Sequence, residues 1–258
     1  MVRAPDAARG QADRRVWLLG CPIDALSMDE TVQRVDEIIR SGVPSQHVAL
    51  NAGGLVDVQR DSRLLEIVRT SALVSADGQS VVWASRLMGH PLPERVAGPD
   101  LFLRLIDLAC VRCYSVYLLG AAEDVVRATR VELEFRHPGL RIVGIHNGYY
   151  EESDSAAIVE EIRYSGAQML FVAMPTPKKE YWLQDNLLLL GVPFCMGVGG
   201  TFDIVVGKIR RSPLWMQRSG LEWAYRLYQE PVRMWRRYLV GNARFVALVL
   251  RERLRRIS

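Results

Sequence analysis

Short apolar segments alternate with longer amphipathic ones along most of this chain, and this alternation constrains the fold more than any other feature. The strand candidates are residues 16–19, 48–50, 73–75, 116–119, 142–145, 169–173 and 194–198. Stretches with helical periodicity separate most of them. Because the strands are apolar throughout, both faces of their sheet must be covered. The pattern predicts an α/β fold with a mainly parallel sheet and helices on both faces.

The predicted helices have recognisable ends. Ser27-x-x-Glu30 is a capping-box signature, and Ser41-Gly42 ends the helix that it opens. Thr176-Pro177 predicts an N-cap and first turn for a helix that runs to Leu190. Further helices are expected over residues 100–111, 123–135 and 154–164.

The character of the chain changes after Gly207, where the strand signals stop. Its 258 residues, 49% hydrophobic and 24% charged, suit one large domain with an appendage. We therefore predict a disordered N-terminal tail (1–15), an α/β core (16–207) and a basic, helical, membrane-associating appendage (208–258).

The charge of the chain is distributed unevenly. Residues 208–258 contain 13 basic and 3 acidic residues, a net charge of +10, whereas the remainder contains 20 basic and 26 acidic residues. Tryptophan and tyrosine alternate with arginine in this appendage, as in helices at membrane interfaces. Packing on the core and nucleic-acid binding are the alternative interpretations. We expect an anionic membrane surface rather than nucleic acid as the partner.

Secretion and membrane insertion are not indicated by the sequence. Residues 1–15 contain no apolar segment of the signal-peptide type, and no stretch approaches the roughly 20 apolar residues of a membrane span. We expect a cytoplasmic protein, peripheral on the inner face of the cell membrane. Cys110 and Cys113 form a CxxC pair without a second pair, so reduced buried thiols are favoured over a metal or redox site.

Polar residues after the strand candidates mark the expected site, because ligands of open α/β sheets bind beyond the carboxyl ends of the strands. Asn51 follows one candidate and Asp77-Gly78 follows the next. Asp77 is a candidate general base, with capping of the 81–87 segment as its structural alternative. Asn51 is a candidate for orienting hydroxyls, with a turn or helix cap as its alternative.

Two further segments are candidate phosphate sites. Thr176, Pro177, Lys178, Lys179 and Glu180 open a predicted helix whose free N–H groups attract anions. A glycine-rich loop follows the last strand candidate and lets backbone N–H groups approach a phosphate; its candidate residues are Gly199, Gly200, Thr201 and Asp203.

Several common site signatures are absent from the sequence. There is no DxD pair, and the four histidines are scattered. The GxGxxG motif of dinucleotide-binding enzymes is missing from the first part of the chain. We therefore expect no metal ion and no cofactor. A departing diphosphate would then be stabilised by Arg, Lys and backbone N–H groups.

Eight motifs in one order make the chain resemble the WecB/TagA/CpsF family of bacterial glycosyltransferases from about Ala49 to Tyr238. They are Asn51; Ala76-Asp77-Gly78; Arg95-Val96-Ala97-Gly98-Pro99-Asp100-Leu101; Leu118-Leu119-Gly120; Asn147-Gly148-Tyr149-Tyr150; Pro177-Lys178-Lys179-Glu180-Tyr181-Trp182; Gly197-Val198-Gly199-Gly200-Thr201-Phe202-Asp203; and Arg211-Ser212-Pro213-Leu214-Trp215-Met216-Gln217 with Gly220-Leu221-Glu222-Trp223. Ala49, Ser80 and Lys179 depart from residues that members often carry.

The resemblance implies a Rossmann-like core and inverting, metal-independent transfer of a sugar from a UDP-sugar. The donor of this family is classically UDP-N-acetylmannosamine. The acceptor would be a sugar on a polyprenyl diphosphate, used to build a cell-surface polysaccharide. Asp77 would be the base, and appendage arginines would complete the site; a homo-oligomer is possible. Beyond the phosphate candidates, the substrate-binding candidates are Gly78, Arg95, Asp100, Gly120, Arg211, Arg218 and Arg226.

Two other functions stay open at this point. One is glucosyl or uronosyl transfer in exopolysaccharide synthesis by the same family. The other is a non-enzymatic, basic, peripheral membrane binder, for which the core is a scaffold.

Overall fold

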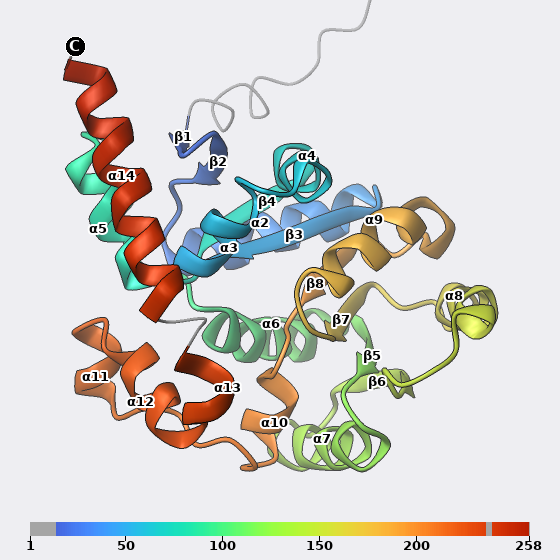
Figure 1. Cartoon of the computed structure of the whole chain (residues 1–258). Helices are drawn as coiled ribbons and strands as arrows, with labels where there is room; N and C mark the ends of the chain where they lie inside the picture. The colour runs from blue at the N-terminus through green and yellow to red at the C-terminus, as the bar shows by residue number, and fades with distance from the viewer. Residues whose placement is uncertain (1–13, 236–238, 258) are drawn as a thin grey trace, which may run out of the picture.

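A six-stranded parallel sheet lies at the centre of the computed structural model, which describes residues 14–235 and 239–257 (Figure 1). Its strands are β3 (Ser45–Leu50), β4 (Leu73–Ala76), β5 (Ser115–Gly120), β6 (Arg141–His146), β7 (Met169–Ala173) and β8 (Phe194–Gly197). The strand order is β4-β3-β8-β7-β5-β6, and every neighbouring pair is parallel. The predicted α/β fold is thereby confirmed, with a Rossmann-like arrangement.

Helices cover both faces of the sheet (Figure 1). Successive strand residues point to opposite faces, so Val116 and Leu118 pack on one side, Tyr117 and Leu119 on the other. One face is covered by α2 (Met28–Ser41), α6 (Gly98–Arg112), α7 (Glu123–Arg136) and α10 (Thr201–Val205). The other is covered by α3 (Ala52–Asp57), α4 (Ser62–Thr70), α5 (Gln79–Leu87), α8 (Ser155–Tyr164) and α9 (Lys178–Leu190). A short 3₁₀ helix, η2 (Glu152–Asp154), precedes α8.

The predicted capping box at the start of α2 is confirmed. The Glu30 amide donates to the Ser27 hydroxyl at 3.2 Å, and the Ser27 amide donates to the Glu30 carboxylate at 2.8 Å. Gly42 ends the helix in the left-handed conformation. These contacts fix both ends of a helix that packs against α6.

The first strand candidate belongs to a hairpin and not to the parallel sheet. β1 (Arg15–Leu18) pairs antiparallel with β2 (Cys21–Asp24), which the sequence did not predict. Leu19 and Gly20 between them both have positive φ, as a two-residue hairpin turn of type I′ requires. Of the tail predicted over 1–15, residues 1–13 lie outside the described residues, and Arg15 already begins β1.

The C-terminal segment is helical, with α11 (Leu214–Arg218), α12 (Glu222–Gln229), α13 (Pro231–Trp235) and α14 (Gly241–Ile257). Helix α14 returns to the core, packs against α3, and donates from Arg253 to the Leu87 carbonyl at the end of α5 (Figure 1). Its Phe245 and Val249 are buried in the apolar cluster that contains α3. Among the described helices, none has both the length and the apolar character needed to cross a membrane.

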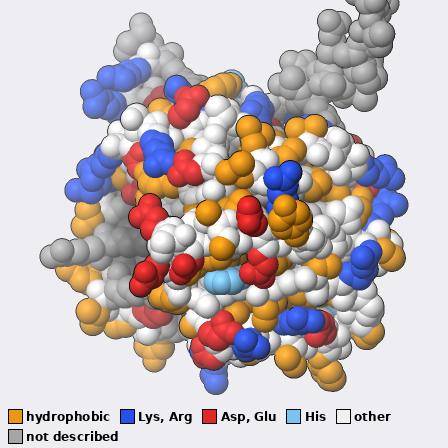
Figure 2. Space-filling model, turned by 90° about the vertical axis from the view of Figure 1, so that its right-hand side faces the viewer, with side chains coloured by type: hydrophobic (Ala, Val, Ile, Leu, Met, Phe, Trp, Pro, Cys, Tyr) orange, Lys and Arg blue, Asp and Glu red, His pale blue; other side chains and the backbone are white. Residues whose placement is uncertain are grey.

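Charges of both signs are interspersed on the core. Figure 2 shows acidic, basic and apolar side chains side by side on the face that corresponds to the right-hand side of Figure 1, where α8 lies. Ion pairs such as Arg130–Glu134, at 2.9 Å, neutralise many of the charges. The excess of positive charge therefore belongs to residues 208–258, which include the four C-terminal helices.

Candidate active site

Asn51 and Asp77 come together at the carboxyl ends of the neighbouring strands β3 and β4. The Asn51 side-chain nitrogen lies 3.5 Å from Asp77 Oδ2, and the Asp77 amide donates to the Leu50 carbonyl at 2.8 Å. Both side chains are partly exposed. The parallel register of the two strands thus produces the pair that the sequence predicted as catalytic.

The structural alternatives for these two residues have different outcomes. Asn51 does cap a helix, since its side-chain oxygen accepts from the Gly54 amide at 3.1 Å. Asp77 does not cap α5, whose N-cap is Gly78 without a side-chain hydrogen bond. Its Oδ1 accepts instead from the Gly98 amide, at 2.7 Å, at the start of α6. The Asp77 carboxylate is therefore fixed through one oxygen, and its other oxygen is turned toward Asn51.

An open cleft with about 880 Å³ of empty space lies over this pair. The core and the C-terminal segment line it together; the residues are Asn51, Ala52, Gly53, Asp77, Gly78, Gln79, Ser80, Arg95, Pro99, Gly220, Glu222, Trp223, Arg226 and Asn242. Gly220 has positive φ, and a Cβ there would lie 2.7 Å from Trp83. Only glycine therefore permits this approach of the C-terminal segment to α5.

A network of ion pairs closes one side of this cleft. Arg95 pairs with Glu222 at 2.6 Å and with Asp100 Oδ2 at 3.8 Å. Arg211 donates to both oxygens of Asp100, at 2.9 Å to Oδ2, and to Gln217 Oε1 at 3.1 Å. The hydrogen bond to Asp100 raises the pKa of Arg211 above its usual value. The network links α6 to α12, so it holds the C-terminal segment over Asp77.

Arg226 lines the same cleft from α12. Its guanidinium makes no hydrogen bond or ion pair within the described part of the chain, so its charge is available to a ligand. Arg218 ends α11, but its side chain lies outside the described residues.

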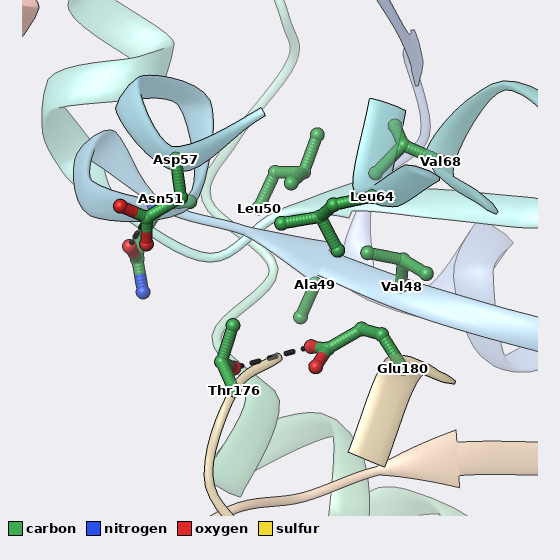
Figure 3. Close-up of a pocket in the computed structure, with 10 residues that line it drawn as sticks. Val48, Ala49, Leu50, Asn51, Asp57, Leu64, Val68, Thr176 and Glu180 are labelled. Atoms are coloured by element: carbon green, nitrogen blue, oxygen red, sulfur yellow. Dashed lines mark hydrogen bonds between the residues drawn. The ribbon is translucent and has the colours of Figure 1, made fainter. Parts of the chain in front are cut away.

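A second, smaller hollow lies beside Asn51 (Figure 3). It is lined by Val48, Ala49, Leu50, Asn51, Gly54, Asp57, Leu64, Val68, Thr176 and Glu180. Figure 3 shows the Glu180 carboxylate turned toward Thr176 beneath β3. Asn51 lines both hollows and so lies between them.

The predicted N-cap at Thr176 is wrong. The N-cap of α9 is Pro177, joined to Thr176 by a cis peptide bond, and no side chain caps the helix. The Thr176 hydroxyl donates to Glu180 Oε1 at 3.2 Å and accepts from Lys179. Because the hydroxyl is committed to these side chains, it does not satisfy a backbone amide.

The phosphate candidates other than Thr176 and Glu180 line neither hollow, and the same holds for the substrate-binding candidate Gly120. Lys178 lies 5.5 Å from the centre of the Tyr150 ring, and the buried Thr201 hydroxyl donates to the Val198 carbonyl at 2.7 Å. Gly120 approaches the Ala173 backbone so closely that a Cβ would lie 2.6 Å from its carbonyl oxygen. The residues of this group are Gly120, Pro177, Lys178, Lys179, Gly199, Gly200, Thr201 and Asp203, at the carboxyl ends of β5, β7 and β8 or just beyond.

Sequence reasoning missed several lining residues. Glu222 and Trp223 lie within a quoted motif, which could have suggested them. Asn242 reaches the cleft because α14 folds back onto the core, the packing that the sequence left open as an alternative for the appendage. Asp57 lines the smaller hollow from the end of α3.

The cysteines differ in burial. Cys21 and Cys195 are buried, and burial raises the pKa of the Cys21 thiol to about 12. Cys113, however, is exposed and Cys110 is partly buried, so the prediction of buried thiols is wrong for this pair. All four are free, and no group of three or more His, Cys, Asp or Glu among the described residues is arranged to hold a metal ion.

Comparison with known proteins supports a single family. A model described as the glycosyl transferase WecG/TagA/CpsF family matches residues 16–258. An N-acetylglucosaminyldiphosphoundecaprenol N-acetyl-beta-D-mannosaminyltransferase of Bacillus spizizenii (strain ATCC 23059 / NRRL B-14472 / W23) is 33% identical over 196 residues, 76% of this chain and 75% of the relative. A protein of the same name from Bacillus subtilis (strain 168) is 32% identical over 193 residues, 75% and 74% of the two chains. The chain thus belongs to the WecG/TagA/CpsF family of glycosyltransferases.

Proposed function

We propose that this enzyme transfers a sugar, by family default N-acetylmannosamine, from a UDP-sugar to a sugar carried on a polyprenyl diphosphate, with inversion and without a metal ion. The names of the two Bacillus relatives support the class of acceptor and the default sugar. The observation that carries the proposal is the Asp77–Asn51 pair at the floor of a cleft lined by arginines.

Asp77 acts as the base in this proposal. The acceptor hydroxyl gives its proton to Asp77 Oδ2 while its oxygen forms a bond to the anomeric carbon of the donor. The bond from that carbon to the diphosphate breaks, and UDP leaves with the electron pair. One such displacement inverts the configuration. The hydrogen bond from Gly98 keeps Oδ1 occupied, so the carboxylate presents a defined oxygen to the acceptor.

Arginines stabilise the charge of the diphosphates. Arg226 is positioned for this role because it lines the cleft beside Asp77 and has no carboxylate partner among the described residues. Arg95 and Arg211 hold Asp100 and Glu222, so they position the C-terminal segment and add positive charge near the cleft. The lack of a DxD pair supports transfer without a metal ion.

The C-terminal segment holds the enzyme on an anionic membrane surface. Exposed aromatic side chains such as Trp215, 63% exposed, and Tyr228, 84% exposed, accompany its arginines. A polyprenyl diphosphate is anchored in a bilayer, so docking there brings Asp77 to the acceptor. The proposed location is the cytoplasmic face of the cell membrane.

A transfer assay tests this function. Purified protein would be mixed with anionic liposomes that contain a polyprenyl-diphosphate-linked N-acetylglucosamine, a panel of UDP-sugars and a metal chelator. Transfer from one neutral donor with inversion is the expected result. Transfer that requires an added divalent cation would overturn the metal-independent mechanism, and folded protein that binds liposomes but not UDP would indicate the non-enzymatic binder.

A further inference from the structure

Two helices, α5 and α14, lead away from the cleft and lie next to each other (Figure 1). Ser80 lines the cleft from the first turn of α5, and Asn242 lines it from the first turn of α14. At the far end the Arg253 guanidinium of α14 donates to the carbonyl of Leu87, the last residue of α5. Contacts at both ends therefore keep the two helices together along the way from the cleft.

The exposed face of α5 becomes apolar beyond the cleft. Trp83 and Leu87 follow Ser80 at intervals of three and four residues, so the three side chains share one face of the helix. Trp83 is half exposed and Leu87 is exposed. A Cβ on Gly220, which lines the cleft, would lie 2.7 Å from the Trp83 ring. The Trp83 ring thus begins at the rim of the cleft.

Helix α14 has the same arrangement. Asn242, Val246 and Leu250 follow one another at intervals of four residues, so the face that lines the cleft continues as an apolar face. Val246 and Leu250 are half exposed. The core takes Phe245 and Val249 from another face of this helix. Packing among the described residues therefore does not account for the apolar character of the exposed face.

Together the two faces form an apolar strip, which consists of Trp83, Leu87, Val246 and Leu250. The strip begins at a cleft that holds the positive charge of Arg226. Helix α5 contains no acidic residue, and the carboxylate of Glu252, the single acidic residue of α14, accepts from the Leu19 amide. A cationic cleft that continues into an apolar strip fits a ligand with an anionic head and an apolar chain.

We infer that the apolar strip binds the isoprenoid chain of the acceptor, with the diphosphate in the cleft and the isoprene units next to it lying along α5 and α14. This inference rests on the proposed function, which supplies the polyprenyl diphosphate. The strip extends about 12 Å along α14 from Asn242 to Leu250, at the rise of an α-helix. It holds only the first part of a polyprenyl chain, and the rest stays in the bilayer. The protein thus recognises the chain directly.

Transfer in the absence of any membrane gives the first test. The acceptors carry N-acetylglucosamine on a diphosphate linked to a methyl, geranyl or farnesyl group, without vesicles or detergent and below the concentration at which they aggregate. With the same panel of UDP-sugars, we expect KM for the farnesyl acceptor to be about tenfold or more below that for the methyl acceptor, at similar kcat. Equal KM values for the three acceptors overturn the inference and leave the bilayer as the site of the chain.

The double variant Val246→Ser/Leu250→Ser tests the strip itself. It should raise KM for the farnesyl acceptor to nearly that of the methyl acceptor and leave both kinetic constants for the methyl acceptor unchanged. Val131→Ser/Leu188→Ser is the matched control, because it replaces exposed residues of the same two types on α7 and α9. The control should behave as wild type.

Two results with these variants contradict the inference. One is a farnesyl KM that stays at the wild-type value in the strip variant or rises equally in the control. The other is an equal loss with methyl and farnesyl acceptors, which would mean that the substitutions disturb the cleft. Should the strip variant not fold, as judged by its thermal melt, the dependence of the wild-type KM on chain length decides the inference.

The outcomes also separate this inference from the proposed function. If the wild-type enzyme uses all three acceptors with the same KM, the inference alone fails. If no acceptor receives a sugar, the proposed function fails, and the binding of farnesyl diphosphate, measured by calorimetry, decides the inference. Binding that is about tenfold weaker in Val246→Ser/Leu250→Ser than in wild type supports the strip, and equal binding by both proteins overturns it.

Discussion

The side-chain nitrogen of Asn51 lies 3.5 Å from the Asp77 carboxylate although 26 residues separate them in the chain. Two adjacent parallel strands end at the same edge of the sheet, and this brings the residues together. Each also supports a helix start, Asn51 that of α3 and Asp77 that of α6. Their positions are therefore fixed by the fold before any substrate binds.

Asp77→Asn should lower turnover by about 10²–10⁴-fold while UDP binding stays close to wild type. The amide cannot take a proton from the acceptor, but its oxygen can still accept from Gly98, so the fold is retained. Steady-state transfer with a saturating donor measures the effect. Asp29→Asn, an exposed carboxylate paired with Arg104, is the control. Turnover that survives in Asp77→Asn would rule out this residue as the base.

Arg226→Met should reduce kcat/KM for transfer by about 10–100-fold, because a charged hydrogen bond to a diphosphate is lost. The apolar replacement keeps most of the side-chain volume. Arg210→Met removes an exposed charge from the same segment and should change kcat/KM little. If both variants lose activity equally, the general charge of the segment matters and not the position of Arg226.

The double variant Arg251→Gln/Arg255→Gln should weaken binding to anionic liposomes by about 30-fold, since each basic residue near such a surface contributes about 1 kcal/mol. Both residues are exposed on α14. Co-sedimentation with vesicles measures the partition coefficient. Arg104→Gln/Arg127→Gln removes two exposed core charges and is expected to bind like wild type. An unchanged partition coefficient for the α14 variant would place the membrane contact elsewhere.

Stability should fall as the pH is lowered, in part because of His47. Burial lowers the pKa of His47 from 6.5 to about 3. Below pH 6.5 the unfolded chain therefore takes up a proton that the folded protein excludes. Folding loses about 1.4 kcal/mol per pH unit from this residue down to pH 3. Urea denaturation at pH 8, 6 and 5 measures the slope, and His47→Gln should flatten it. The same slope in both proteins would mean that other groups cause the pH dependence.

The strands and most helices could be predicted because apolar periodicity and end signals are local. The capping box of Ser27 and Glu30 is entirely local and was confirmed. The proximity of Asn51 and Asp77 could be predicted because residues after adjacent parallel strands converge. The side-chain contacts of Thr176 could not be predicted. Its hydroxyl binds Glu180 and Lys179 and does not cap the helix, and tertiary packing decides between these partners. Asn242 likewise enters the cleft through long-range packing of α14.

The hydrogen bond from the Leu19 amide to the Glu252 carboxylate, at 3.0 Å, joins the first hairpin to the last helix. A ribosome makes Glu252 233 residues after Leu19. Until the segment with Phe245 and Val249 emerges, the nascent chain leaves the apolar side of α3 uncovered. The cleft, which includes Asn242, is also unfinished until then. The apolar cluster and the candidate active site are therefore completed together, only when α14 has been made and has folded back, and a chain that lacks α14 has neither in complete form.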